Sequence, residues 1–139
     1  MHIDIILYNM ADKSTILKAF NTLFFDFLDD IIGIVENNED IRSAKTTFEM
    51  FRKGNPTIII KVWHSYVYVP YAEVINAGNL EFFINKDYSE DLSVLSNSGD
   101  LIKTIDKIRD PIRNMSDTNK THSLAYIQKL SLLSAAYSK

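Results

Sequence analysis

Apolar residues recur at helical spacing over the first third of the chain. The steps of three and four residues from Ile16 to Val35 form one broad apolar face, which predicts a long amphipathic helix at the centre of the fold. Asp12 or Ser14 can cap its start, because either side chain can accept a hydrogen bond from the first turn. Phe24 lies in the middle of this face and is expected in the core, whereas Phe25 falls on the polar side.

A second and narrower apolar stripe predicts a helix from about Glu39 to Lys53. Asn38 can cap its start, and Gly54 stands where a helix usually ends. Further apolar spacing predicts short helices over 71–77 and 80–84, a packing helix over 101–115 that Pro111 kinks, and a last helix over 119–137.

The stretch from Thr57 to Val69 fits two structures. Its β-branched and aromatic residues favour a strand, whereas its length and its flanks favour a buried helix. Asn55 followed by Pro56 is a strong helix start, and Ile59, Val62, Trp63, Tyr66 and Val67 stand at helical spacing on one stripe. We predict a helix that Pro70 ends or kinks.

Length and composition agree with this helical pattern. The chain has 139 residues, of which 46% are hydrophobic, and this fits one ordered domain. Four glycines and three prolines are too few for a β protein rich in turns. We therefore predict one domain over residues 1–139 of the all-α class, an irregular bundle of about five to seven helices. Residues 1–12 are expected to form a docking arm or a short strand.

The absence of cysteine excludes disulfides, thiol nucleophiles and thiolate metal sites. A net charge of −3 gives no overall field that favours nucleic acid or a membrane. The longest uncharged run, from Val62 to Ala72, is too short to span a bilayer, and no segment has the pattern of a signal peptide. We expect an intracellular protein, in the cytoplasm or the nucleus, that is neither secreted nor membrane-bound.

Candidate catalytic and metal-binding groups are weak in this sequence. Asp26 and Asp30 are one turn apart and, with Asp29, could share a hard cation, but a solvated helix face is the simpler interpretation. His64 stands in an apolar stretch, where a partly buried and hydrogen-bonded histidine is expected. No nucleophile elbow, phosphate-binding glycine loop or dinucleotide fingerprint is present. We predict no enzymatic activity, no cofactor and no metal.

Basic residues of the C-terminal third offer an alternative site. Pairs of them stand one helical turn apart and could follow a phosphate backbone: Lys103, Lys107, Arg109 and Arg113. Asp106 and Asp110 interleave with them at the spacing of intrahelical ion pairs, so a self-neutralised surface helix is the simpler interpretation. A nucleic-acid-associated factor is therefore the alternative function.

Four segments, in their order along the chain, resemble small uncharacterised proteins of large DNA viruses that infect algae and other protists. The segments are Pro56–Trp63, Val69–Tyr71, Phe82–Tyr88 and Ile105–Arg109, and the resemblance covers about residues 20–137. It implies a viral protein that acts in the infected host cell or in the virion. It implies no catalytic residue.

Large apolar side chains outnumber the positions that these helical faces bury. Phe25 lies on the polar side of the first helix, Tyr68 falls off the stripe that follows Ile59, and Ile5 and Leu7 stand in the N-terminal arm. A contiguous patch of such residues usually marks an interface. We predict a non-enzymatic structural or protein-interaction protein, a minor virion component or a binder of a host or viral protein, that associates with a protein partner or with itself through these residues.

Overall fold

The computed structural model describes residues 12–35, 38–85, 104 and 107–139, and all the regular structure in these ranges is helical. The predicted all-α class and the predicted bundle are therefore confirmed. The elements are α2 (Lys13–Ile34), α3 (Glu39–Gly54), α4 (Ile58–Val62), the π-helix η1 (Trp63–Tyr68), α5 (Val69–Asn76), α6 (Leu80–Asn85), α9 (Arg109–Arg113) and α10 (Asp117–Tyr137). The predicted arm with Ile5 and Leu7 lies outside the described residues, as does Lys103.

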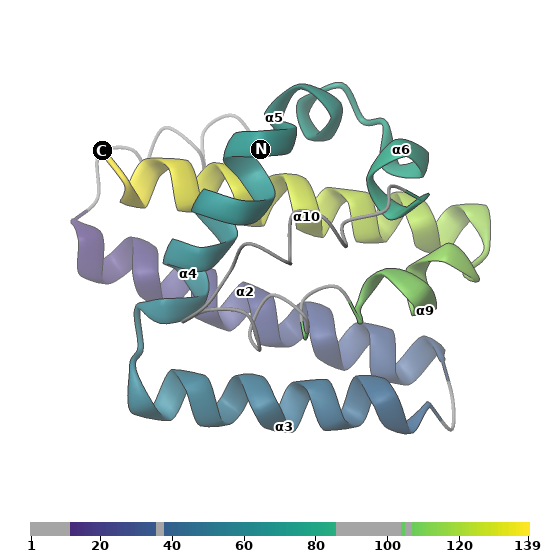
Figure 1. Cartoon of the computed structure of the whole chain (residues 1–139), viewed down its shortest axis with the longest axis horizontal. Helices are drawn as coiled ribbons and strands as arrows, with labels where there is room; N and C mark the ends of the chain where they lie inside the picture. The colour runs from purple at the N-terminus through teal and green to yellow at the C-terminus, as the bar shows by residue number, and fades with distance from the viewer. Residues whose placement is uncertain (1–11, 36–37, 86–103, 105–106) are drawn as a thin grey trace.

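Helix α2 is the central element, with α3 along one side and α10 along the other (Figure 1). It begins where the sequence predicts, because the Asp12 carboxylate accepts from the backbone N–H of Thr15 at 2.8 Å. Asn38 caps α3 in the same way, by accepting from two backbone N–H groups of its first turn. Helices α2 and α10 run antiparallel: the Lys13 ammonium lies over the Tyr137 ring at one end, and Tyr126 bonds Asp30 towards the other.

The core is an aromatic cluster around Phe24, whose side chain is fully buried. The Phe24 ring is stacked at 6.0 Å on Phe20 and meets Phe48 of α3 edge-to-face at 4.8 Å. It also meets Trp63 of η1 edge-to-face at 6.1 Å. The Trp63 indole N–H donates to the Ser131 hydroxyl of α10 at 3.0 Å, so its one polar group is satisfied inside the core. Four elements thus meet at this cluster.

Residues 58–76 run through α4, η1 and α5 without an intervening loop, and this kinked segment crosses α2 and α10 (Figure 1). The prediction that Thr57–Val69 is helical is confirmed, and the predicted kink lies at Tyr71, directly after Pro70, where φ is −125°. The π-helix precedes this proline. Proline has no N–H to donate to the preceding turn, and the wider π turn, with bonds such as Val69 N–H to the His64 carbonyl, accommodates that loss.

The π turn also changes which aromatic side chains face the core. Tyr66, predicted on the buried stripe, is 41% exposed, whereas Tyr68 packs against the core. A π-helix has more residues per turn than an α-helix, so the inward stripe continues from Trp63 to Val67 and then to Ile75. The regular 3.6-residue period therefore gave the wrong orientation for both tyrosines.

Phe25 is buried, with 8% of its surface exposed, and the prediction that it is an open contact for a partner is wrong. Its ring meets Phe24 edge-to-face at 5.6 Å, and the Arg52 guanidinium of α3 lies 4.1 Å from its centroid. The residues around Phe25 on this side of α2 are polar in the sequence. Because α3 packs along the same side, a cation–π contact nevertheless covers the Phe25 ring.

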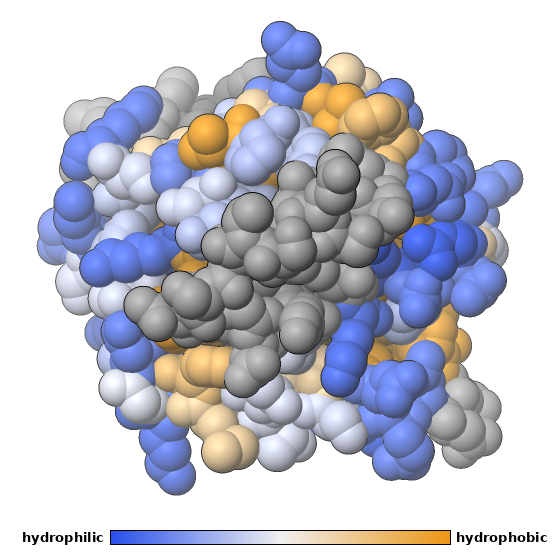
Figure 2. All heavy atoms as spheres, in the orientation of Figure 1, coloured by the Kyte–Doolittle hydropathy of each residue, from blue (hydrophilic) through white to orange (hydrophobic). Residues whose placement is uncertain are grey.

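Among the residues that the structure describes, the exposed large apolar side chains belong to six different helices. They are Ile34, Met50, Tyr66, Val69, Phe82 and Leu132. On the face that Figure 2 shows, apolar atoms likewise reach the surface in separate areas between hydrophilic side chains. Singly exposed apolar residues of this kind are normal and do not by themselves form a docking surface.

Candidate protein-binding groove

The two longest helices, α2 and α10, leave a groove along their line of contact. Two depressions of about 320 and 240 Å³ follow each other along this line, and both are lined by residues of α2 and α10. The α2 residues of the floor and edge recur at one-turn intervals, from Ala19 and Leu23 to Asp30 and Ile34. The groove therefore extends over most of the length of α2.

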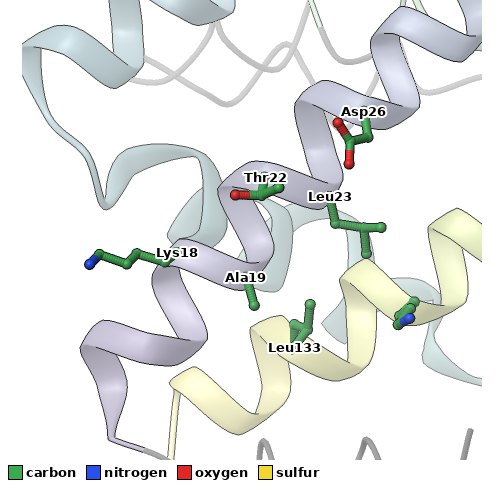
Figure 3. Close-up of a pocket in the computed structure, with 7 residues that line it drawn as sticks. Lys18, Ala19, Thr22, Leu23, Asp26 and Leu133 are labelled. Atoms are coloured by element: carbon green, nitrogen blue, oxygen red, sulfur yellow. The ribbon is translucent and has the colours of Figure 1, made fainter.

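The larger depression has an apolar floor and a charged rim. Figure 3 shows Ala19 and Leu23 of α2 and Leu133 of α10 between the two helices. The rim carries charged side chains and one hydroxyl, from Lys18, Thr22, Asp26 and Lys129. Lys18 extends away from α10, as the same figure shows. None of the three charged rim groups forms an ion pair within the described part of the chain.

The smaller depression is organised by Tyr126. Its hydroxyl donates to the Asp30 carboxylate, and its ring stacks on Phe27 at 4.9 Å. The hydrogen bond to Asp30, together with burial and the negative charge of Asp30 and Asp26, raises the pKa of Tyr126 to about 12. Ile34, 40% exposed, and His122 complete the open end. Tyr126 thus links α10 to α2 within the smaller depression.

The groove presents apolar side chains together with charged and hydroxyl groups. The Tyr126 hydroxyl donates to Asp30, and its pKa, raised to about 12, makes it a weaker acid than an ordinary tyrosine. Asp26 and Asp30 are both exposed, which agrees with the solvated helix face expected for them. Among the described residues, no three His, Asp or Glu side chains come together in a way that could hold a metal ion.

Of the residues predicted to bind a partner, the two that the structure describes, Phe25 and Tyr68, do not line this groove. Phe25 is buried under α3, and the Tyr68 hydroxyl accepts from the side-chain amide of Asn76 at 3.2 Å on the α5 side of the molecule. Sequence analysis missed the groove because it arises from the pairing of two helices that are far apart in sequence; Asp30 and Tyr126, for example, are 96 positions apart. The available signal was the set of Ala19, Leu23 and Asp26, which follow one another at the margin of the apolar face of α2.

Two of the four basic residues of the alternative site, Arg109 and Arg113, hold helices together. Arg113 donates to the Ile84 carbonyl at 2.6 Å and to the Asn85 side chain at 3.1 Å, and it pairs with Asp110. Arg109 also reaches the Ile84 carbonyl, at 3.4 Å. Both arginines therefore cap the carboxyl end of α6, where cations are favourable. Lys107 is exposed.

His64 is partly buried, as predicted, but it is not fully hydrogen-bonded. Its Nδ1 is buried and has no hydrogen-bond partner among the described residues, and its ring lies 6.1 Å from that of Tyr68. The expectation of a hydrogen-bonded histidine is therefore wrong for Nδ1. His64 lies within the π-helix η1, and no described side chain or backbone group hydrogen-bonds its Nδ1.

Comparisons with protein-family models, with curated proteins and with solved structures found no match to this chain. In the part of the chain that the structure describes, none of the helices combines the length and the hydrophobicity that a bilayer crossing requires. The groove itself is therefore the basis for a functional proposal.

Proposed function

We propose that this protein is a non-enzymatic protein-interaction protein, and that it binds an amphipathic helix in the groove between α2 and α10. The observation that carries the proposal is the composition of the groove: an apolar floor of Ala19, Leu23 and Leu133, bordered by charged groups without ion-pair partners in the described part. A helix laid between two antiparallel helices is a common packing arrangement.

The charges of the groove define the partner. A helix in this position would place its apolar stripe on the floor and its flanking residues against the rim. It would carry acidic residues opposite Lys18 and Lys129 and basic residues opposite Asp26 and Asp30. Such complementarity contributes specificity and a faster encounter, whereas the buried apolar contact provides most of the affinity.

The resemblance of segment order adds a biological setting to this proposal. We propose that the protein is virus-encoded and acts in the infected cell, in the cytoplasm or the nucleus, or as a minor component of the virion. A role as an adaptor that holds a helical segment of a host or viral protein agrees with the open groove of the described part.

The nucleic-acid alternative is less well supported, because the two arginines that would contact phosphate are engaged at the end of α6. The two functions differ in their response to salt. Nucleic-acid binding through several lysines and arginines falls steeply and linearly with the logarithm of salt concentration, whereas docking on an apolar floor is much less sensitive. A steep salt response of binding to DNA or RNA would favour the alternative.

Site-specific photo-crosslinking in the cells that produce the protein tests the groove directly. A benzophenone amino acid at Thr22, on the exposed rim, is expected to form a covalent adduct with the bound partner. The same group at Lys53, an exposed residue of α3 outside the groove, is the matched control and is expected to form none. Equal labelling from both positions, or no adduct from Thr22, would contradict the proposal.

A further inference from the structure

We propose that residues 1–11 of the same chain bind in the larger depression of the groove and compete there with the partner helix. This inference rests on the proposed function, because it adds regulation to the surface described above. Residues 1–11 lie outside the described part of the chain. Their sequence, their point of attachment and the side chains that line the depression favour them as its occupant.

The larger depression lies close to the point where residues 1–11 join the fold. Asp12 caps the first turn of α2 with an extended backbone. The α2 residues that line the depression, from Lys18 to Asp26, stand about 9–21 Å beyond Asp12 along the helix axis. Eleven residues span about 16 Å as a helix and up to about 36 Å when extended. A chain that turns back at Asp12 therefore reaches the depression in either form.

The sequence of residues 1–11 carries an apolar stripe that suits the floor of the depression. Its apolar residues recur at the spacing of one helical face: Ile3, Ile6, Leu7 and Met10. The floor consists of Ala19 and Leu23, both partly exposed, and Leu133. Contact between the stripe and the floor removes apolar surface of both from water, which is favourable. The segment thus has the pattern expected of the partner helix itself.

The charge of residues 1–11 also matches the depression. Asp4 is the only Asp, Glu, Lys or Arg in this segment, and on a helix it stands at the edge of the apolar stripe. Lys18 and Lys129 line the depression and form no ion pair within the described part of the chain. A helix that runs back along α2 from Asp12 brings Asp4 to the level of these lysines, about 12 Å from the turn. Their attraction would fix the register of the segment.

The covalent connection makes a weak contact sufficient. A tethered segment has an effective concentration of about a millimolar, so residues 1–11 can occupy the groove even if a free peptide of this sequence binds poorly. A partner helix has to displace the segment, and its apparent dissociation constant rises as the fraction of open grooves falls. Residues 1–11 would therefore act as an autoinhibitory segment that admits only partners with stronger contacts.

Photo-crosslinking within the purified full chain tests this inference. A benzophenone amino acid at Thr22, on the rim of the depression, is expected to form an adduct with residues 1–11 of the same chain. Mass spectrometry after proteolysis identifies the joined peptides, and a yield that does not depend on protein concentration shows that they belong to one chain. The same group at Lys53, outside the groove, is the control and is expected to form no adduct with residues 1–11.

Substitutions within the segment give the contact its specificity. Ile6→Asp places a charge in the apolar stripe and is expected to lower the yield of the adduct at least about fivefold. The matched control is Ile5→Asp, the same change at the neighbouring residue on the opposite side of the helical projection, which should leave the yield unchanged. Asp4→Lys should also lower the yield, and its combination with Lys129→Glu should restore it, because opposite charges then face each other again. This recovery separates repulsion from a failure to fold.

The outcomes separate this inference from the proposed function. An adduct of Thr22 with any other segment or with a second chain, or equal effects of Ile5→Asp and Ile6→Asp, overturns the inference. In cells, Ile6→Asp is expected to increase the amount of partner that the Thr22 group captures. Capture of a different protein with no increase leaves the proposed function standing without the inference. An intrachain adduct with no capture by either form means that residues 1–11 complete the fold, and it overturns both.

Discussion

Replacement of Phe24 by alanine removes the side chain on which the core is centred. Its ring is fully buried and contacts four other aromatic rings, from α2, α3 and η1. No single neighbour can close the space that Phe24→Ala would leave, because these rings belong to different helices and each is held by further packing.

The expected loss of unfolding free energy is about 3–5 kcal/mol, the usual range for truncation of a buried phenylalanine. The upper half of this range is expected here, because aromatic pairs contribute about 0.5–1.5 kcal/mol each beyond their buried area. A domain of this kind is stabilised by only about 5–15 kcal/mol in all. The variant should therefore remain folded at room temperature, but with a much smaller free energy of unfolding.

Urea denaturation followed by far-ultraviolet circular dichroism measures this loss, provided that the slope with denaturant stays unchanged. The matched control is Phe82→Ala, the same truncation at a residue that is 47% exposed on α6. It should reduce the unfolding free energy by less than about 1 kcal/mol, because most of its ring is already in water. Equal losses for the two variants would show that Phe24 is not the centre of the core.

Three further substitutions test the surface and the polar groups of the bundle. Asp29→Ala breaks an exposed ion pair with a lysine of α3 and should lower the unfolding free energy by about 0–1 kcal/mol in a denaturation experiment. Ser131→Ala leaves the buried N–H of Trp63 without its acceptor and should cost about 1–3 kcal/mol, whereas an unchanged midpoint would mean that the indole finds another partner. Tyr126→Phe removes the hydrogen bond to Asp30. Because the pKa of Tyr126 is raised to about 12, this bond stabilises the fold fully below pH 10 and is lost as the pH rises towards 12. The difference in unfolding free energy between parent and variant should therefore vanish over that interval. In a titration followed by tyrosine absorbance, the variant should lack the component with the highest pKa.

Local patterns predicted the helices well because each helix carries its own signals. The carboxylate of Asp12 and the amide of Asn38 mark helix starts in sequence and do so in the structure. The helical spacing after Asn55 outweighed the β-branched residues of the same stretch, and a helix formed there. These features depend on residues within one or two turns, which a sequence displays directly.

The orientation of side chains after Trp63 could not be predicted in this way, because the π turn shifts the period by which buried positions recur. Tyr66 and Tyr68 exchanged roles for that reason. Phe25 was misplaced because the group that covers it, Arg52, comes from another helix. The groove is the feature least visible in the sequence. Its floor joins Leu23 to Leu133, and only the packing of α2 against α10 brings these two residues together.

The π-helix between α4 and α5 has a consequence for how the chain can vary in length. A π turn is equivalent to an α-helix that holds one additional residue. Loss of one residue between Trp63 and Tyr68 would return this stretch to α turns and leave Ile59 and Ile75, before and after it, on the core side where both are buried. The same loss within α2 would rotate every later residue of that helix by about 100° and turn its apolar face out of the core. Natural or engineered single-residue deletions should therefore be tolerated in η1 and rejected in α2.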